Sequence, residues 1–250
     1  MKLKLLPLAL IAVTIFSCSS DDDSADDNNV DDPEKSEEQV TSCDKVENFV
    51  FVEKDGLVSV EFEDAAFTNN WKLKKDGNNI SGKGYMVWEG DQYLGKPGEG
   101  LATYSIKINS PGTYRFLWKS AVKKGNNGAD HNDSWLRFAD AKDFFGEKDG
   151  SIVYPQDTGK TPNPKGASKD GWFKVYRSGG DLDFKWQAST SDNDSHPIFV
   201  TFDKAAVYTM EISARSAGHA IDKFVLFKDS VNQSDATADD VKSSEITCKN

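Results

Sequence analysis

The chain has 250 residues, of which 37% are hydrophobic and 28% are charged. This composition excludes a collagen, a coiled coil and a wholly disordered chain, and the 15 Phe, 7 Tyr and 6 Trp can supply a sizeable core. The net charge of −11 argues against nucleic-acid binding, which requires clustered Lys and Arg side chains. Residues 18–42 alone carry seven Asp, three Glu and one Lys, so most of the acidity lies in this segment and the remaining chain is nearly balanced.

The first 17 residues have the pattern of a bacterial export signal. Lys2 and Lys4 precede an apolar run over 5–16, which is too short to cross a hydrocarbon layer of about 30 Å as a helix. The sequence at 15–18, Ile-Phe-Ser-Cys, resembles a bacterial lipobox, in which the cysteine, Cys18, is lipidated and begins the mature chain. An ordinary secretory signal with an incidental cysteine is the alternative.

Residues 18–42 follow as a polar, acidic segment with almost nothing to bury, and we expect them to form a disordered tether. The beginning of this segment, 19–23, resembles the acidic export signal that sends Bacteroidetes lipoproteins to the outer face of the outer membrane. A solvated spacer is the alternative interpretation. The predicted location is therefore the outer membrane, with the protein exposed on the cell surface.

Two further cysteines, Cys43 and Cys248, flank the rest of the chain. An exported protein folds in an oxidising compartment, and the termini of a domain often lie close together. We therefore predict a disulfide between these two residues, with a pair of free thiols as the alternative.

Hydrophobic alternation with a period of two predicts an all-β domain between the cysteines. The expected strands lie at 58–63, 102–108, 113–118, 134–138, 172–176, 182–186, 198–202, 206–212 and 221–227, with turn signals between them. Residues 140–171, with three Pro and five Gly, are expected to be a long irregular insertion. No segment has a convincing helical period, so the prediction is a single antiparallel β-sandwich over 43–250, with its core at about 50–229.

Two motifs near the ends of this region carry a family resemblance. Residues 60–65 read Val-Glu-Phe-Glu-Asp-Ala, and residues 219–226 read His-Ala-Ile-Asp-Lys-Phe-Val-Leu. With these motifs the chain resembles carbohydrate-binding modules of families 6 and 35, which are galactose-binding-like β-jelly rolls. The resemblance covers about 57–228 and implies carbohydrate binding. Such modules often place a ligand-binding Asn two residues before the terminal Asp, and this chain has Ala220 there.

The same resemblance implies a structural Ca²⁺ held by Glu61, Glu63 and Asp222 together with backbone carbonyls. Physical chemistry is consistent with this, because carboxylates at i and i+2 of a strand point to the same face and Ca²⁺ prefers six to eight oxygen ligands. The alternative is that both glutamates form the solvent side of an edge strand.

Candidate sugar-binding residues are aromatic rings and polar loop side chains, since sugar sites combine an apolar surface with a few placed hydrogen-bonding groups. Trp118, inside an alternating strand, is expected in the core, and Trp135 and Trp186 could lie either in the core or on a face. Trp88 and Trp172 are better candidates for exposure.

Two polar loops, 130–135 and 191–196, combine acidic, amide and imidazole groups. Such residues also favour ordinary turns, which is the alternative for each of them. We expect these loops to share one end of the sandwich with Trp88 and Trp172 and to bind a ligand or a second metal. The candidate ligand-binding residues are Trp88, His131, Asn132, Asp133, Trp135, Trp172, Asp192, Asp194, His196, Arg215 and His219.

The sequence thus predicts a non-catalytic, surface-anchored lipoprotein that binds a polysaccharide, algal or plant and neutral or anionic, for nearby importers and glycanases. One alternative is a jelly-roll polysaccharide lyase or hydrolase, in which His131 and Tyr154 or Tyr176 would supply the base and the acid. The chain contains no Gly-x-Ser-x-Gly, His-Glu-x-x-His or Walker motif. A protein-binding adhesin is the third possibility, and it predicts a large exposed apolar patch.

Overall fold

Nearly all regular structure in the computed structural model, which describes residues 43–68 and 70–249, is β-strand. The predicted export signal, Cys18 and the acidic tether lie outside these residues. The elements, in chain order, are η1 (Val46–Asn48), β1 (Phe49–Val52), β2 (Leu57–Glu61), β3 (Trp71–Lys74), β4 (Tyr85–Trp88), β5 (Ala102–Ile108), β6 (Gly112–Val122), β7 (Asp133–Arg137), β8 (Asp143–Lys148), β9 (Ser151–Val153), β10 (Ser168–Lys169), β11 (Trp172–Tyr176), β12 (Lys185–Trp186), β13 (Ser189–Thr190), β14 (His196–Phe202), β15 (Ala206–Ser213), β16 (His219–Phe227), α1 (Gln233–Ala236) and β17 (Ile246–Cys248).

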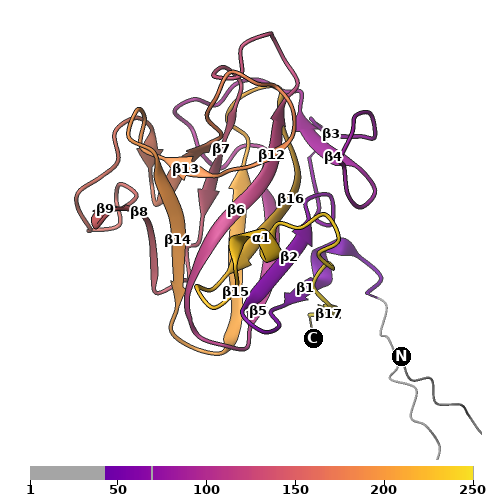
Figure 1. Cartoon of the computed structure of the whole chain (residues 1–250), viewed down its shortest axis with the longest axis vertical. Helices are drawn as coiled ribbons and strands as arrows, with labels where there is room; N and C mark the ends of the chain where they lie inside the picture. Colours follow the sequence, from indigo (N-terminus) through magenta and orange to yellow (C-terminus); the bar gives the residue numbers. More distant parts are fainter. Residues whose placement is uncertain (1–42, 69, 250) are drawn as a thin grey trace, which may run out of the picture. The chain divides into compact units, whose positions relative to one another are not determined.

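The strands form two sheets that face each other as a β-sandwich, which confirms the predicted fold class (Figure 1). Sheet A runs β17-β1-β5-β15-β7-β11, with β10 and β13 beside β11. Sheet B runs β3-β4-β16-β6-β14-β8-β9, with β2 beside the second half of β16 and β12 beside β6. All these pairings are antiparallel except β1 with β5, and the sheets join where β13 pairs with β14.

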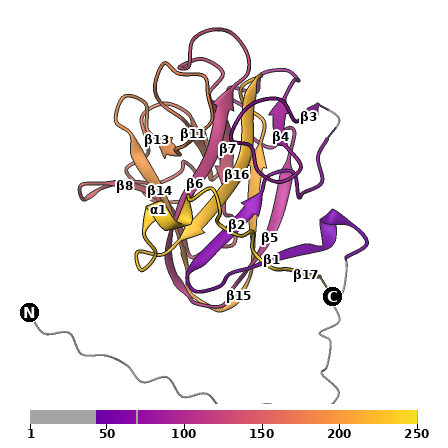
Figure 2. The same cartoon turned by 45° about the vertical axis from the view of Figure 1, so that its right-hand side comes forward.

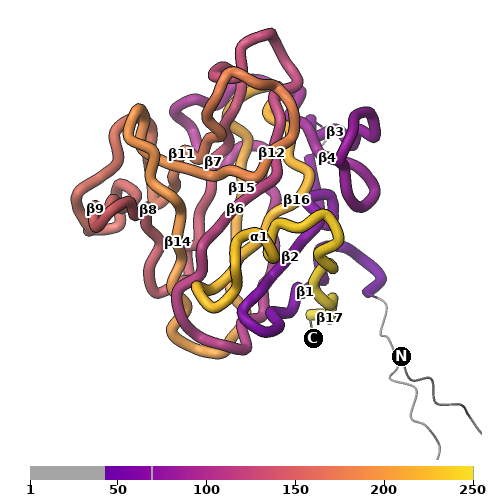
Figure 3. The backbone as a smooth tube through the Cα atoms, in the orientation of Figure 1, coloured from indigo at the N-terminus to yellow at the C-terminus, as the bar shows by residue number. Residues whose placement is uncertain are grey.

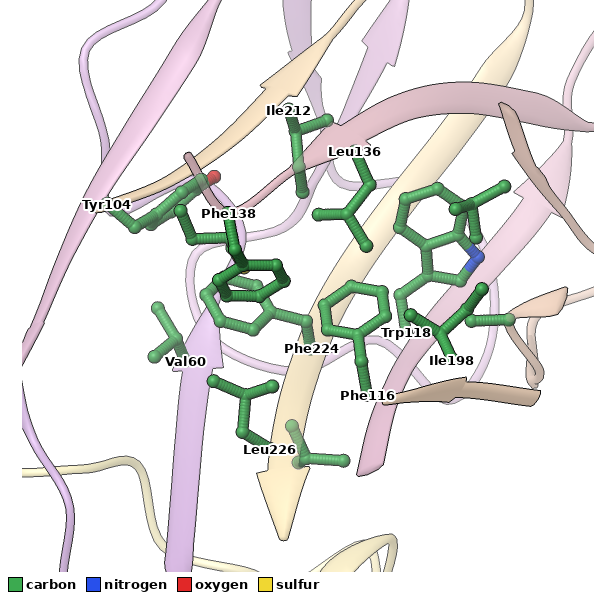
Figure 4. Close-up of a cluster of buried hydrophobic side chains, with 14 of the residues drawn as sticks. Val60, Tyr104, Phe116, Trp118, Leu136, Phe138, Ile198, Ile212, Phe224 and Leu226 are labelled. Carbon is green, nitrogen blue, oxygen red and sulfur yellow. The ribbon is translucent and has the colours of Figure 1, made fainter. Parts of the chain in front are cut away.

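The core lies between the two sheets because alternate residues of each strand point inward. On β6, Tyr114, Phe116 and Trp118 are fully buried, and the prediction that Trp118 belongs to the core is confirmed. Figure 4 shows Phe116 and Trp118 of sheet B beside Leu136 and Ile212 of sheet A. Edge-to-face packing of Phe116 with Trp118, at a centroid distance of 5.6 Å, adds to the burial of their surface.

The segment 140–171 is more regular than the sequence indicates. Instead of an irregular insertion it contains β8, β9 and β10, and β8 pairs with β14 over four residue pairs. The reason is that Phe144 enters the core and packs against Phe138 and Phe173. The many turn residues of the segment belong to the connections between these short strands.

The ends of the described chain are fastened together. Cys43 and Cys248 form a disulfide with a Cα–Cα distance of 5.5 Å, which confirms the prediction, and β17 pairs with β1 beside it. Figure 2 shows these two strands together at one edge of the sandwich. No helix within the described residues has the length and apolarity needed to cross a membrane.

Long connections gather at the other end of the sandwich, at the top of Figure 3. The β6–β7 connection lies against the β11–β12 connection, and Gly128 is at their contact. A Cβ atom there would lie 2.6 Å from the carbonyl oxygen of Gly179. Only glycine therefore allows these two loops to pack, and together they border the outer face of sheet B.

Candidate functional site

A pocket of about 460 Å³ opens on the outer face of sheet B near its edge. Its floor comes from alternate residues of β4, because Met86 and Trp88 point into the core while Tyr85 and Val87 point outward. Tyr85 and Val87 join Ala121 of β6 and Ala220 of β16 in a small apolar cluster separate from the core. The residues that line the pocket are Lys74, Asp76, Tyr85, Val87, Trp88, Glu89, Lys123, Lys124, Ala217 and Gly218.

Main-chain hydrogen bonds hold the wall of the pocket in place. The Lys123 amide donates to the carbonyl of Gly218 at 2.8 Å, and the Gly218 amide donates to the carbonyl of Trp88 at 2.7 Å. Gly218 has a φ of +91° and a Cβ there would collide with Lys124. Glycine is thus required both for the backbone conformation and for the close approach of the two segments.

An aromatic pair capped by a lysine stands at one side of the pocket. The rings of Tyr85 and Phe184 pack edge to face with centroids 5.0 Å apart, and the Lys123 Nζ lies 4.9 Å and 5.1 Å from the two ring centroids. Phe184 is half-buried and Lys123 is exposed. This arrangement places the half-buried ring of Phe184 and an exposed hydrogen-bond donor next to each other.

The remaining polar groups of the pocket are paired with each other. Tyr85 Oη donates to Asp76 at 3.1 Å. The pKa of Tyr85 is raised, mainly by burial and to a smaller extent by this carboxylate. Lys74 forms an ion pair with Glu89 at 2.9 Å. Among the described residues, Lys123 and Lys124 form no ion pair, so two ammonium groups of the wall remain available to a ligand.

The tryptophans predicted to be exposed are buried. Trp88 is 2% exposed although it is among the residues that line the pocket, and Trp172 is 3% exposed beneath the guanidinium of Arg137. Trp135 is also in the interior, whereas Trp186 on β12 is half-buried. The expectation of exposed rings is wrong because loop residues cover the strand ends on which these tryptophans lie. Trp88 and Trp135 donate their indole N–H groups to the loop carbonyls of Asp91 and Tyr93.

The polar residues of the loop at 130–135 form internal hydrogen bonds. Asp133 accepts from Arg215 and from Ser216, and Arg215 also lies over the ring of Trp135 at 5.3 Å. Asn132 Nδ2 donates to the carbonyl of Arg177 at 2.6 Å. His131 has a φ of +55°, so it takes a turn conformation.

The loop at 191–196 lies beside β9 and residues 165–174. These neighbours differ from those of Trp88, with which the loop was expected to share one end of the sandwich. Asp192 pairs with Lys174, and Asp194 pairs with Lys148 at 3.2 Å. His196 is 1% exposed and contacts Ser151 Oγ at 3.0 Å. The positive φ of Ser191 and Asn193 shows that the turn alternative describes the backbone of this loop.

His219 is wholly buried at the start of β16. Its Nδ1 lies 2.8 Å from Ser134 Oγ, and its ring packs edge to face on Trp118 at 5.1 Å. The pKa of His219 is lowered to about 3, mainly by burial and to a smaller extent by the nearby positive charge of Arg177. A neutral imidazole without access to solvent is positioned to hold the core together and not to contact a ligand.

The three predicted calcium ligands do come together, around the loop at 81–83. Ser81 Oγ donates to Glu61 at 2.6 Å and the Ser81 amide donates to Asp222 at 3.1 Å, while the Lys83 amide donates to Glu63 at 2.5 Å. Burial raises the pKa of Glu63 to about 7 and also raises the pKa of Asp222.

Two ammonium groups already bind these carboxylates, Lys119 at Asp222 and Lys223 at Glu61. Within residues 43–68 and 70–249, no group of three or more His, Cys, Asp or Glu side chains is arranged to hold a metal. The residues present therefore do not fit a calcium ion between these carboxylates, and calcium binding itself stays a prediction for experiment.

Sequence reasoning missed the residues that build the pocket. Tyr85 lies in the segment 82–88, where alternation could have assigned it to the face opposite Trp88, but nothing in the sequence brings Lys123 and Phe184 to it. That proximity depends on the packing of the loops around Gly128 and Gly218.

Comparisons with known proteins give similarities at low identity. No family model matches the chain. An uncharacterized protein of Formosa agariphila is 24% identical over 218 residues, which cover 72% of this chain and 46% of that protein. The chain thus spans about half the length of this curated relative.

The solved structures that are similar to this chain include three at 13–18% identity. A carbohydrate-binding module, CBM6cm-2, from a Cellvibrio mixtus lichenase in complex with cellotriose is 14% identical and covers 68% of this chain and 96% of its own, with a TM-score of 0.38. A CBM35 from Cellvibrio japonicus is 13% identical and covers 78% and 98%, with a TM-score of 0.38. A GH26-CBM35 β-(1,4)-mannanase from Podospora anserina is 18% identical and covers 70% and 28%, with a TM-score of 0.41.

Proposed function

We propose that this chain is a non-catalytic, cell-surface lipoprotein that binds a polysaccharide at the pocket lined by Tyr85, Lys123 and Lys124 and presents it to degrading enzymes and importers. The observation that carries the proposal is the pocket itself, with two unpaired lysines in its wall and Phe184 packed beside it against Tyr85 and Lys123. The motif resemblance to carbohydrate-binding modules of families 6 and 35 points in the same direction.

The pocket has the size and chemistry that a sugar ring needs. Its volume of about 460 Å³ falls in the range of ordinary ligand sites, roughly 300–1,000 Å³. Phe184, half-buried beside the pocket, supplies ring surface, and Lys123 and Lys124 supply donors for hydroxyl, carboxylate or sulfate oxygens. An open site of this kind gives modest affinity for one sugar, and a long polymer with many anchored copies adds avidity.

Binding without catalysis is the form of the proposal that the pocket favours. The two carboxylates that line it are engaged by Lys74 and by Tyr85, whereas a glycosidase needs one carboxyl as acid and another as base or nucleophile. Incubation of the protein with polysaccharides is expected to release no reducing ends and no unsaturated sugar. Release of either product would support the lyase or hydrolase alternative.

The surface of the described residues favours a glycan over a protein partner. Its exposed large hydrophobic residues are Leu73, Leu94 and Val207, which come from β3, the β4–β5 loop and β15. Single apolar residues of this kind are normal on a soluble surface, whereas adhesion to a protein usually uses a contiguous patch.

Anchoring through Cys18 completes the proposal and has its own test. Metabolic labelling with a fatty-acid analogue should mark the wild-type protein, and Cys18→Ser should remove the label and release the protein from the membrane fraction. External protease should digest the wild type on intact cells. Label that persists in the variant, or full protection from protease, contradicts the anchoring part of the proposal without affecting the glycan part.

Affinity electrophoresis tests binding at the pocket. Gels cast with neutral, uronic and sulfated polysaccharides should retard the wild type in at least one case. Phe184→Ala and Lys123→Ala should each weaken that retardation. For the ring lost in Phe184→Ala, the binding free energy should fall by about 1–3 kcal/mol. Phe145→Ala is the matched control, because Phe145 is also half-buried but stacks on Phe199, 5.7 Å away, on β8 and β14. Equal weakening by the control variant contradicts the assignment of the pocket.

A further inference from the structure

A buried charge cluster lies where β2, β16 and the loop at 81–83 meet. Asp222 is wholly buried and Glu61 is 9% exposed. Two lysines lie among these carboxylates, with Lys119 Nζ 3.3 Å from Asp222 Oδ2 and Lys223 Nζ 2.9 Å from Glu61 Oε1. Lys119 is 8% exposed and Lys223 is 4% exposed. Each buried acid therefore has a buried base at ion-pair distance.

The strand geometry fixes this arrangement. Lys223 is opposite Glu61 in the pairing of β16 with β2, and opposite Lys119 in the pairing of β16 with β6. The β16–β6 register shifts between Ile221 and Lys223, so Asp222 is an extra residue in the strand. Because of this bulge, Ile221 and Phe224 both stay in the core, and Asp222 and Lys223 both leave it.

The oxygens of these two carboxylates are engaged by the chain itself. Glu61 Oε1 also accepts from Ser243 at 3.0 Å, and Glu61 Oε2 accepts from Ser81 at 2.6 Å. Asp222 Oδ1 accepts from the Ser81 amide at 3.1 Å. A calcium ion would need six to eight oxygens, and it would have to displace two ammonium groups whose side chains are almost wholly buried.

We infer that Lys119 and Lys223 take the structural place that the family resemblance assigns to calcium, so that the sandwich holds Glu61 and Asp222 by internal ion pairs and folds without metal. Burying a charge without a partner is prohibitive, and removing one member of a buried pair is strongly destabilising. The lysines therefore do for this junction what a bound cation would do, and they tie β2, β6 and β16 together.

Glu63 is the third residue of the predicted calcium set and is the one that the lysines do not reach. Its Oε1 accepts from the Lys83 amide at 2.5 Å, and its Oε2 is buried with no hydrogen-bond partner among the described residues. Gly82, with a φ of +59°, packs directly against Glu61 and Glu63. A single free carboxylate edge in this crowded loop is too few donors for a calcium site.

Thermal unfolding of the purified full chain tests the inference, with elemental analysis of the same samples. The wild type should show the same Tm after exhaustive chelation and in excess CaCl₂, and it should contain no stoichiometric calcium. A higher Tm in CaCl₂, or one calcium per chain that survives gel filtration, would overturn the inference.

The double variant Lys119→Met/Lys223→Met tests whether the two lysines stabilise the fold or make no contribution to its stability. In chelator its Tm should be lower than that of the wild type by at least about 6 °C, and failure to fold is the extreme of the same effect. Lys83→Met is the matched control, because Lys83 binds Asp64 at 2.8 Å beside the cluster but its side chain is 69% exposed, so its loss should change Tm little. A double variant as stable as the wild type contradicts the inference.

Discussion

Trp88 provides the sharpest test of the packing described above, because the sequence suggests a ligand contact and the structure assigns it to the core. Its indole is wedged between two glycines of the following loop. A Cβ on Gly90 would lie 2.5 Å from the ring, and a Cβ on Gly100 would lie 2.7 Å from it. We predict that Trp88→Ala destabilises the fold.

The magnitude follows from what the ring contacts. Trp88 packs edge to face on Trp71 at 5.5 Å and against Tyr93 at 6.0 Å, and its N–H donates to the carbonyl of Asp91 at 2.7 Å. Truncating a buried tryptophan to alanine costs about 3–5 kcal/mol. For a domain of this size, each kcal/mol lowers Tm by about 2–4 °C, so a fall of about 6–20 °C is expected.

Urea unfolding followed by circular dichroism measures this loss, with Trp186→Ala as the matched control. Trp186 is half-buried on the short strand β12, so its replacement should cost clearly less than that of Trp88. If Trp88→Ala unfolds at the wild-type midpoint while binding polysaccharide more weakly, the buried assignment is refuted and the ring acts as a ligand platform.

Three further predictions concern stability. Replacing Cys43 and Cys248 by Ser should lower the free energy of unfolding by up to about 5 kcal/mol, as chain-entropy scaling gives for a loop of this length; unchanged urea midpoints would contradict it. His219 has a folded pKa of about 3, below its unfolded value of about 6.5, so stability should fall as the pH drops below 6.5. At pH 5 the loss attributable to His219 is about 2 kcal/mol, and it should be absent in His219→Gln, whose other titrating groups are the same; equal losses in both proteins would show that His219 titrates in the fold. Asp133→Ala should cost about 3 kcal/mol by leaving the Arg215 guanidinium buried without its carboxylate, and a loss below about 1 kcal/mol, typical of exposed pairs, would show that this contact is solvated.

Much of the fold was predictable because a strand that is buried on one face has alternating hydrophobic and polar residues. Each of the nine expected strands overlaps a strand of the structure, and the expected strand at 113–118 is part of the longer β6. The strand β8 was missed because it is held by non-local pairing with β14. The strands β9 and β10 are only three and two residues long, in hairpins with β8 and β11, so turn residues dominate the local pattern. The disulfide was predictable because only two cysteines flank the region.

The candidate site was much less predictable, since the composition of a loop does not tell what covers it. Asp133 and Arg215 were identified as polar residues able to bind a ligand, but they pair with each other. Lys119 and Lys223 look like ordinary strand lysines, and the bulge at Asp222 is what brings Asp222 and Lys223 to the side of the sheet where Lys119 lies. Long-range register therefore decides which polar residues are free and which are structural.

The central claim, that the pocket on β4 binds a polysaccharide, is tested most directly by amide chemical-shift mapping. The protein is titrated with an oligosaccharide prepared from the polymer that retards it most in the gels. Shift changes should concentrate at the residues that line the pocket, which are Lys74, Asp76, Tyr85, Val87, Trp88, Glu89, Lys123, Lys124, Ala217 and Gly218. They should need more oligosaccharide to develop in Phe184→Ala and in Lys123→Ala. Changes confined to other faces of the sandwich, or no change at saturating oligosaccharide, would contradict the claim.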